Sequence, residues 1–177
     1  MTSTSRRTFW ILAITLLLTL GVMVLLASLA PLEKDLGAKV RVVYFHGAWG
    51  WAGKAAFGLA AISGLLGLLR LRGDWPAWSL ALGRAGLTFW LTYLPMSLWV
   101  MQLNWGGLFL DEPRWRIPFA FGVAGLLLQI ALAIFNSPWL TGLGNLAFGV
   151  ALWMVLGGLQ NILHPDSPIF SSDSNRI

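Results

Sequence analysis

The two histidines of this chain are its best candidates for metal chemistry. His46 lies within residues 41–51, where a charged stretch gives way to a long apolar run, and His164 lies where the last apolar run ends. Neutral imidazole is a good metal ligand, and two imidazoles from separate segments can bind one iron from opposite sides. The pair therefore predicts a site for a flat ligand that contains a metal.

The amino-acid composition predicts a protein that lies largely within a lipid bilayer. Hydrophobic residues make up 57% of the 177 residues and charged residues only 11%, which is typical of a polytopic membrane protein. The chain has no cysteine, so disulfides, Cys-ligated metals and covalently attached haem are excluded, and any haem would be haem b. The net charge of +5 comes from a few charges at the ends of apolar runs, which indicates contact with lipid headgroups and not with nucleic acid.

Five apolar runs must position the histidines, and each is near the roughly 20 residues that a membrane-spanning helix needs. The predicted spans are residues 8–30, 44–69, 80–103, 117–135 and 139–163. Charged or proline-containing turns separate them, and Pro95 is expected to kink the third. We therefore expect an all-α polytopic membrane protein with a single transmembrane domain over residues 1–177.

The expected orientation depends on the first span. Arg6 and Arg7 precede it, which places the N-terminus on the cytoplasmic side of a bacterial-type inner membrane. The same arginines resemble an export signal, but the apolar run is longer than a signal-peptide core and Pro31 would follow the cut, so we expect a retained anchor. Five spans then place the C-terminus outside, with both histidines at a similar external depth.

The helix faces below the histidines suggest where a ligand would lie. At about 100° per residue, mostly small or aromatic residues lie below each histidine on one stripe of its helix. These residues are Gly50, Gly53 and Phe57 under His46, and Gln160, Gly157 and Trp153 under His164. The stripe under His46 predicts a groove for a flat ligand. An interfacial hydrogen-bonding role for the histidines and a helix-packing role for the glycines are the alternatives.

Lys54 lies about 12 Å inside the second span, where a charged amine is costly unless it reaches the surface or finds a partner. One reading is that it extends toward the outer surface along an aromatic lining. The other is that it pairs with a carboxylate of a bound ligand, and haem carries two propionates. Cations near the outer rim could serve the same carboxylates: Lys39, Arg41, Arg114 and Arg116.

Motifs along most of the chain carry a family resemblance. Residues 43–46 with Ala48 and Trp49 open the second span, a Trp-containing loop at 104–116 follows the third, and residues 161–165 close the fifth with a histidine. In this order the chain resembles the haem-handling membrane proteins of cytochrome c maturation, the CcmC/CcsA type, which carry an external "WWD" loop between two external histidines. The resemblance implies bis-histidine ligation of haem b by His46 and His164.

The resemblance also assigns residues of the loop to the haem edge. Trp49, from the motif that opens the second span, and Lys54, from its depth in that span, are further cofactor-binding candidates. The loop residues are Trp105, Gly106, Gly107, Phe109, Pro113 and Arg114. The loop departs from the family pattern, because Leu108, Phe109 and Asp111 stand at tryptophan positions and Glu112 at the aspartate position. The family's further span after the second histidine is also missing. We therefore expect this loop to cover a haem only together with a partner, such as another membrane subunit or a maturation protein.

Three functions remain open from the sequence. The first is a haem-handling protein of cytochrome c maturation, which we prefer. The others are a haem-b electron-transfer subunit, or a structural subunit, of a respiratory or photosynthetic complex. Met96 and Met101 are the alternative axial ligands. The chain has no Ser/His/Asp set, phosphate-binding glycine loop or dinucleotide fingerprint, so we expect no enzymatic activity.

Overall fold

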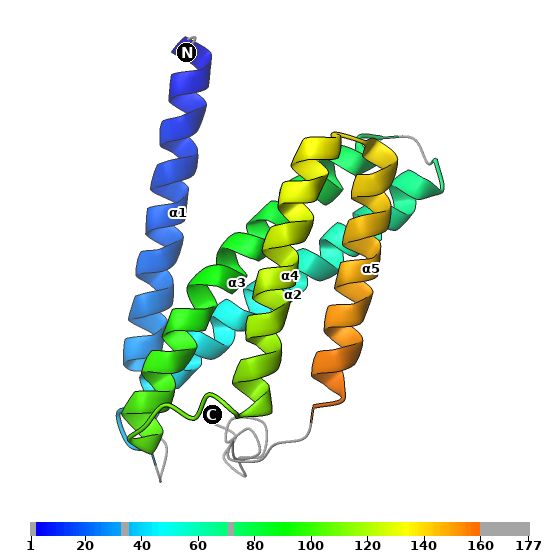
Figure 1. Ribbon diagram of the computed structural model, residues 1–177. Coiled ribbons are helices and arrows are strands. Elements are labelled where there is room, and N and C mark those ends of the chain that lie inside the picture. Colours follow the sequence, from blue (N-terminus) through cyan, green and yellow to red (C-terminus); the bar gives the residue numbers. More distant parts are fainter. Residues whose placement is uncertain (1–2, 33–35, 71–72, 160–177) are drawn as a thin grey trace. The chain divides into compact units, whose positions relative to one another are not determined.

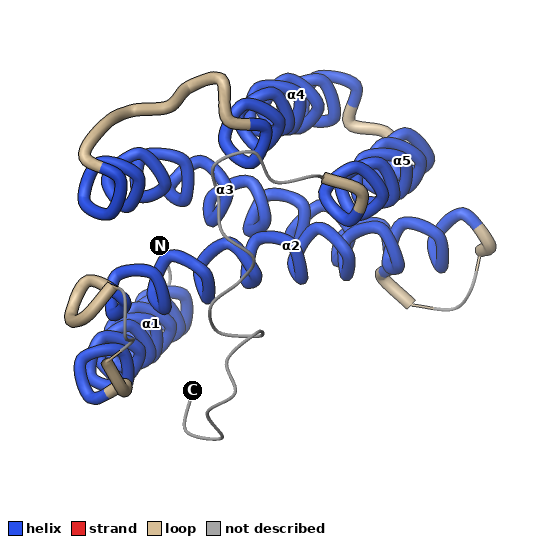
Figure 2. Tube along the Cα trace, turned by 90° about the horizontal axis from the view of Figure 1, so that it is seen from below, coloured by secondary structure: helices blue, strands red, loops and turns tan. Residues whose placement is uncertain are grey.

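The computed structural model describes residues 3–32, 36–70 and 73–159, and these residues form five helices (Figure 1). The helices are α1 (Ser3–Leu29), α2 (Val40–Leu68), α3 (Trp75–Trp105), α4 (Pro113–Phe135) and α5 (Pro138–Gly157). Loops and turns connect them, and the described ranges contain no strand (Figure 2). The predicted all-α class is confirmed.

Four of the helices in the described ranges are long and apolar enough to cross a membrane, namely α1, α2, α4 and α5. Helix α3 is the longest, with 31 residues, but its several tryptophans, glycines and serines and Arg84 make it less apolar. Length and composition therefore support a membrane protein with four helices able to span, which is one fewer than the sequence predicted.

The described residues divide into two compact units between Phe45 and His46. In the first unit, nearly all side chains of α1 from Arg6 to Leu29 are exposed. Apolar side chains on all faces of a helix are typical of a segment surrounded by lipid or by other helices. Near the start of α2, the Tyr44 hydroxyl donates a hydrogen bond to the Pro31 carbonyl at 3.4 Å.

In the second unit, α2 to α5 run alternately up and down, so that the start of α2, the end of α3, the start of α4 and the end of α5 lie at one end (Figure 1). Local sequence explains the sharp turn between α4 and α5. Asn136 closes α4 in the left-handed conformation with φ of 45°, the Ser137 hydroxyl accepts from the Leu140 amide, and Pro138 begins α5.

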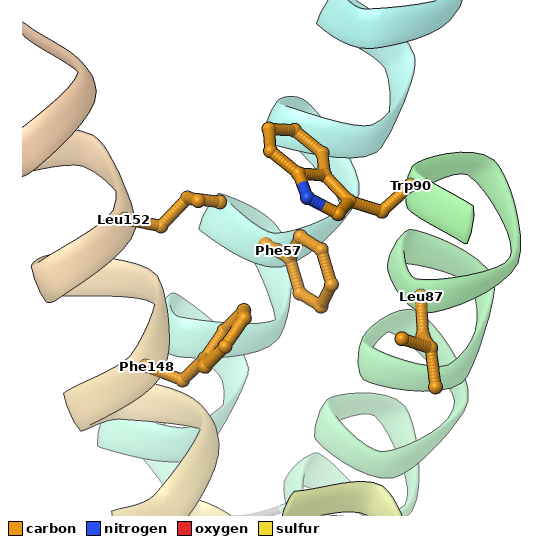
Figure 3. Close-up of a cluster of buried hydrophobic side chains, with 5 residues drawn as sticks. All are labelled: Phe57, Leu87, Trp90, Phe148 and Leu152. Atoms are coloured by element: carbon orange, nitrogen blue, oxygen red, sulfur yellow. The ribbon is translucent and has the colours of Figure 1, made fainter. Parts of the chain in front are cut away.

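The core of this unit is built from α2, α3 and α5 (Figure 3). Its buried residues are Phe57, Leu87, Trp90, Phe148 and Leu152. The Phe57 ring lies 4.8 Å from Phe148 and 6.1 Å from Trp90, measured between ring centroids. The indole N–H of Trp90 donates to the Pro118 carbonyl at 2.9 Å, which satisfies a buried donor and joins α3 to α4.

Glycines allow α2 and α5 to pack at backbone contact. A Cβ atom at Gly64 would lie 2.5 Å from the Gly142 carbonyl oxygen, and one at Gly149 would lie 2.9 Å from the Phe57 carbonyl oxygen. Small residues at such positions let membrane helices approach closely, where dispersion and polar contacts stabilise them.

Beyond the core, a buried polar cluster joins the four helices of this unit. The Asn145 amide donates to the carbonyl and hydroxyl oxygens of Ser79 at 2.9 and 3.1 Å, and its own oxygen accepts from Gln129 at 2.8 Å. The Ser79 hydroxyl donates in turn to the Ala60 carbonyl at 2.9 Å. We call Ser79, Gln129 and Asn145 the polar clasp, because they connect α3, α4 and α5 to each other and to α2.

Candidate functional site

His46 lies in the second turn of α2, and its side chain packs against α3. The imidazole stacks on the Tyr93 ring, with 4.7 Å between centroids and 20° between planes. Its Nε2 atom lies 3.3 Å from the Ser97 hydroxyl oxygen, and Ser97 also lies within hydrogen-bonding reach of the Tyr93 side chain. Both partners are one helical turn apart on α3, so one face of α3 fixes the histidine.

The groove predicted below His46 is filled by α3. A Cβ atom at Gly50 would lie 2.9 Å from the Tyr93 ring, and one at Gly53 would lie 3.1 Å from the Trp90 ring. Phe57, lower on the same stripe, is only 2% exposed and belongs to the core. The predicted groove for a flat ligand is therefore wrong, because the glycines instead admit the aromatic rings of the neighbouring helix.

Trp49 lies one turn after His46 and also contacts α3. Its indole N–H donates to the Thr92 hydroxyl at 2.8 Å, and its ring meets Phe89 edge-on at 4.8 Å between centroids. The structure thus brings Trp49 and His46 to the same helix–helix contact.

Lys54 is held between two tryptophans. Its ammonium lies 4.1 Å from the ring centroid of Trp51 and 4.6 Å from that of Trp153, and the Trp153 indole donates to the Lys54 carbonyl at 3.2 Å. Gly58 makes room for this indole, since a Cβ atom there would lie 3.0 Å from its nitrogen. The cation is thus stabilised by two aromatic faces, as in the first of the two readings for this lysine.

Arg114 connects these features. It lies in the first turn of α4, after Pro113, and it is close enough to interact electrostatically with both Lys54 and Tyr93. Its Nε atom is buried without a hydrogen-bond partner among the described residues. An imidazole and two cations therefore occupy one neighbourhood at one end of the second unit.

The loop between α3 and α4 is a compact turn anchored on Met101. Gly106 closes α3 with φ of 71°, and the Phe109 amide donates to the Met101 sulfur at 2.8 Å. The rings of Trp105 and Phe109 pack edge to face at 6.0 Å, with Gly107 beside Phe109. Met101, one of the alternative metal ligands, is 5% exposed and serves here as the anchor of the loop.

The outer part of this loop presents apolar side chains. Leu108, Phe109 and Leu110 are 54%, 39% and 48% exposed, whereas Glu112 at the start of α4 is buried. Trp115 stacks on Phe119 at 5.1 Å between centroids, within α4 itself. The aromatic residues of the loop thus contact one another and not the imidazole of His46.

His164 and Gln160 lie outside the described residues, so the predicted pairing of the two histidines stays a prediction. Within the described ranges, no three His, Cys, Asp or Glu side chains come together to hold a metal ion. Sequence reasoning missed Tyr93 and Ser97 as partners of His46, and Trp51 as a partner of Lys54. Tyr93 and Ser97 share one face at i, i+4 spacing, which was the available signal, but the register between two helices was needed to use it.

We compared the chain with protein-family models, curated proteins and solved structures, and no match was found in any of the three comparisons.

Proposed function

We propose that this protein binds haem b at the His46 end of its helices and handles haem in cytochrome c maturation. The observation that carries the proposal is the buried Nε atom of Arg114, which has no hydrogen-bond partner among the described residues, on a guanidinium that contributes electrostatically at Lys54 and at the tyrosine stacked on His46. Haem needs a ligand for its iron and cations for its two propionates. The three side chains supply both from α2 and α4.

The cationic side chains of Lys54 and Arg114 are suited to binding an anionic ligand. A cation near the hydrocarbon region is costly without a counter-charge, and the Nε atom of Arg114 is buried without a hydrogen-bond partner among the described residues. The guanidinium of Arg114 can bind a carboxylate through two parallel hydrogen bonds, and its buried Nε atom still has a donor to offer. A propionate beside Arg114 and Lys54 would neutralise this charge.

In this proposal, His46 holds the iron, Arg114 and Lys54 hold the propionates, and Trp49 orders the start of α2 against α3. By the family resemblance, His164 is the second axial ligand, and Trp105, Gly106, Gly107, Phe109 and Pro113 border the haem edge. When bound, the haem would supply redox chemistry and the cargo for transfer. The exposed Leu108 and Leu110 would contact a partner membrane subunit or maturation protein, as expected for a loop that lacks the tryptophans needed to cover a haem alone.

The proposed topology has α3 as a fifth span, since it packs against α4 through the Trp90–Pro118 hydrogen bond and against α2 through Gly53. The N-terminus then lies in the cytoplasm and the His46 end faces outward in a bacterial-type inner membrane. This orientation depends on Arg6 and Arg7 before the first span.

A haem-b electron-transfer subunit is the second candidate. The stacking of His46 on Tyr93 favours it, because a histidine held by a neighbouring ring is suited to holding a cofactor permanently. The two functions differ in release: a handling protein passes haem to an apocytochrome, whereas an electron-transfer subunit retains it during the same incubation.

Haem titration of the purified protein in nanodiscs tests the role of Arg114. Loss of a charge-assisted hydrogen bond costs about 1.5–3 kcal/mol, so we expect Arg114→Ala to bind haem roughly 10- to 100-fold more weakly. Arg84→Ala is the matched control, because Arg84 is an exposed arginine in the first half of α3 that has no role in the proposed site. Equal haem affinity of the two variants, or a wild type that binds no haem, would contradict the proposal.

A further inference from the structure

The exposed face of α3 differs from the exposed faces of the other helices in the second unit. On α2 and α5, and on α4 after its first turn, the exposed side chains include no charged, hydroxyl or carboxamide group. The exposed face of α3 carries four such residues, which we call the α3 stripe: Arg84, Thr88, Thr92 and Gln102. At about 100° per residue, they fall within about 80° of the helix circumference. Because polar side chains of spanning helices usually face other protein, the α3 stripe indicates a protein neighbour.

Arg84 is the residue of the α3 stripe that most needs a partner. It lies nine residues after Trp75, the first residue of α3, which corresponds to about 14 Å along the helix. In the proposed topology α3 crosses the membrane, so the guanidinium would lie at the level of the hydrocarbon, where a cation without a counter-charge is costly. The exposed residues beside it, Ala81 and Ala85, are small, so a neighbouring helix could approach closely.

A lipid phosphate is the alternative counter-charge, because a long cationic side chain can extend toward the nearer membrane surface. That explanation accounts for Arg84 alone. The α3 stripe continues away from that surface through Thr88 and Thr92, whose hydroxyls donate to the carbonyls of Arg84 and Thr88 at 3.0 and 2.8 Å. Their donors are therefore satisfied within α3, while the Thr88 oxygen can still accept a hydrogen bond from another helix. A neighbouring protein helix accounts for the whole stripe.

We propose that the exposed face of α3 binds a membrane helix of a different protein, and that an Asp or Glu of that helix pairs with Arg84. None of the five described helices contains an acidic residue. Neither α1 nor the helices of a second copy could therefore place a carboxylate beside Arg84. The partner is a membrane protein with an intramembrane carboxylate flanked by small residues. This inference rests on the proposed topology, in which α3 is a span, and is independent of haem binding.

Association of a synthetic membrane helix with the full chain in liposomes tests this inference. The probe is a spanning Leu/Ala peptide with one Glu at the depth of Arg84, and the same peptide with Gln is its control. Energy transfer to a dye on the Leu69→Cys variant measures binding, because Leu69 is an exposed residue directly after α2 in a chain without cysteine. Polar contacts between membrane helices contribute about three- to twentyfold in association, so we expect the Glu peptide to bind that much more tightly.

Matched variants of the labelled protein separate the charge from the face. Arg84→Gln should remove the preference for the Glu peptide, whereas Arg116→Gln, which changes an exposed arginine of α4, should keep it. Ala85→Leu should weaken binding of the Glu peptide at least about threefold, because a large side chain would hold the peptide away from Arg84. Ala124→Leu adds the same bulk to the exposed face of α4 and should have no effect.

Three results would overturn the inference. Equal binding of the Glu and Gln peptides by the wild type would leave Arg84 a residue that only reaches lipid headgroups. Energy transfer between labelled copies of the protein that is lost in Arg84→Gln would assign the face to a second copy. Rapid reaction of Ala85→Cys with a membrane-impermeant maleimide would place this face in water and contradict the proposed span. Haem is absent from all these measurements, so the inference and the haem proposal can fail separately.

Discussion

The two ends of the second unit treat buried polar groups in opposite ways. At the polar clasp, the Asn145 amide makes three hydrogen bonds that connect neighbouring helices. At the His46 end, Lys54 rests on two aromatic rings, and the Nε atom of Arg114 is buried without a hydrogen-bond partner among the described residues. The clasp also leaves the Gln129 Oε1 atom without a partner among the described residues, so the ends differ in the charge of their buried groups. Neutral amides and hydroxyls connect helices at the clasp, whereas a buried guanidinium at the other end offers a donor that a ligand could use. The clasp thus connects helices, and the His46 end is where the proposed ligand would bind.

Breaking the polar clasp should have the largest effect on stability. Asn145→Ala removes three interhelical hydrogen bonds and leaves groups of Ser79 and Gln129 unsatisfied, so we expect a loss of about 2–4 kcal/mol in the free energy of unfolding. Denaturant unfolding in bicelles measures it. Gln102→Ala is the control, because Gln102 is an exposed amide on α3. If the two variants are equally stable, the clasp does not hold the helices together.

Substitution of Gly64 tests the close packing of α2 against α5, which is also expected to stabilise the helices. An added methyl group would meet the Gly142 carbonyl oxygen at 2.5 Å, so Gly64→Ala must push α2 away from α5. We expect a destabilisation of about 1–3 kcal/mol in the same unfolding assay. Gly47→Ala is matched on the same helix, since nothing lies within 4 Å of a Cβ atom there. A Gly64→Ala protein as stable as Gly47→Ala would refute the backbone contact.

Lys54→Met should have the smallest effect on stability. It removes a charge whose described contacts are two aromatic faces, so we expect a change below about 1 kcal/mol in the free energy of unfolding. Haem affinity should nevertheless fall by about three- to tenfold, because a propionate loses a cation. Arg84→Met is the control, because Arg84 is an exposed cation in the first half of α3, far along the helix from the end near His46. This substitution should alter neither the stability nor the haem affinity. If the Lys54→Met protein binds haem with unchanged affinity, Lys54 does not bind a propionate and only packs against the two tryptophans.

The helices were predictable because apolar runs and breaker residues are local signals. The fourth helix nevertheless starts at Pro113 and not near residue 117, because proline at the first helical position allows Arg114 and Arg116 into the first turn. The polarity of α3 was also visible in the sequence, yet its length and the two turns around it led to a prediction of five equivalent spans.

The surroundings of the site were less predictable, because they depend on contacts between helices. Helical periodicity placed Gly50 and Gly53 on the face of His46, but it could not show that Tyr93 and Trp90 fill the space beside them. The same limit applies to Lys54, whose second tryptophan, Trp153, comes from a helix about 100 residues later in the chain. Side-chain chemistry was therefore predictable residue by residue, while pairing across helices required the register of the fold.

The optical and EPR spectra of the haem-loaded protein test the central claim most directly. We expect the wild type in nanodiscs to give a low-spin, bis-histidine haem b, since the chain contains two histidines and no cysteine. His46→Ala should lose this spectrum, and a cysteine-free chain offers no thiolate to replace the ligand. A His46→Ala protein that retains an unchanged low-spin haem would contradict the assignment of His46 as an axial ligand.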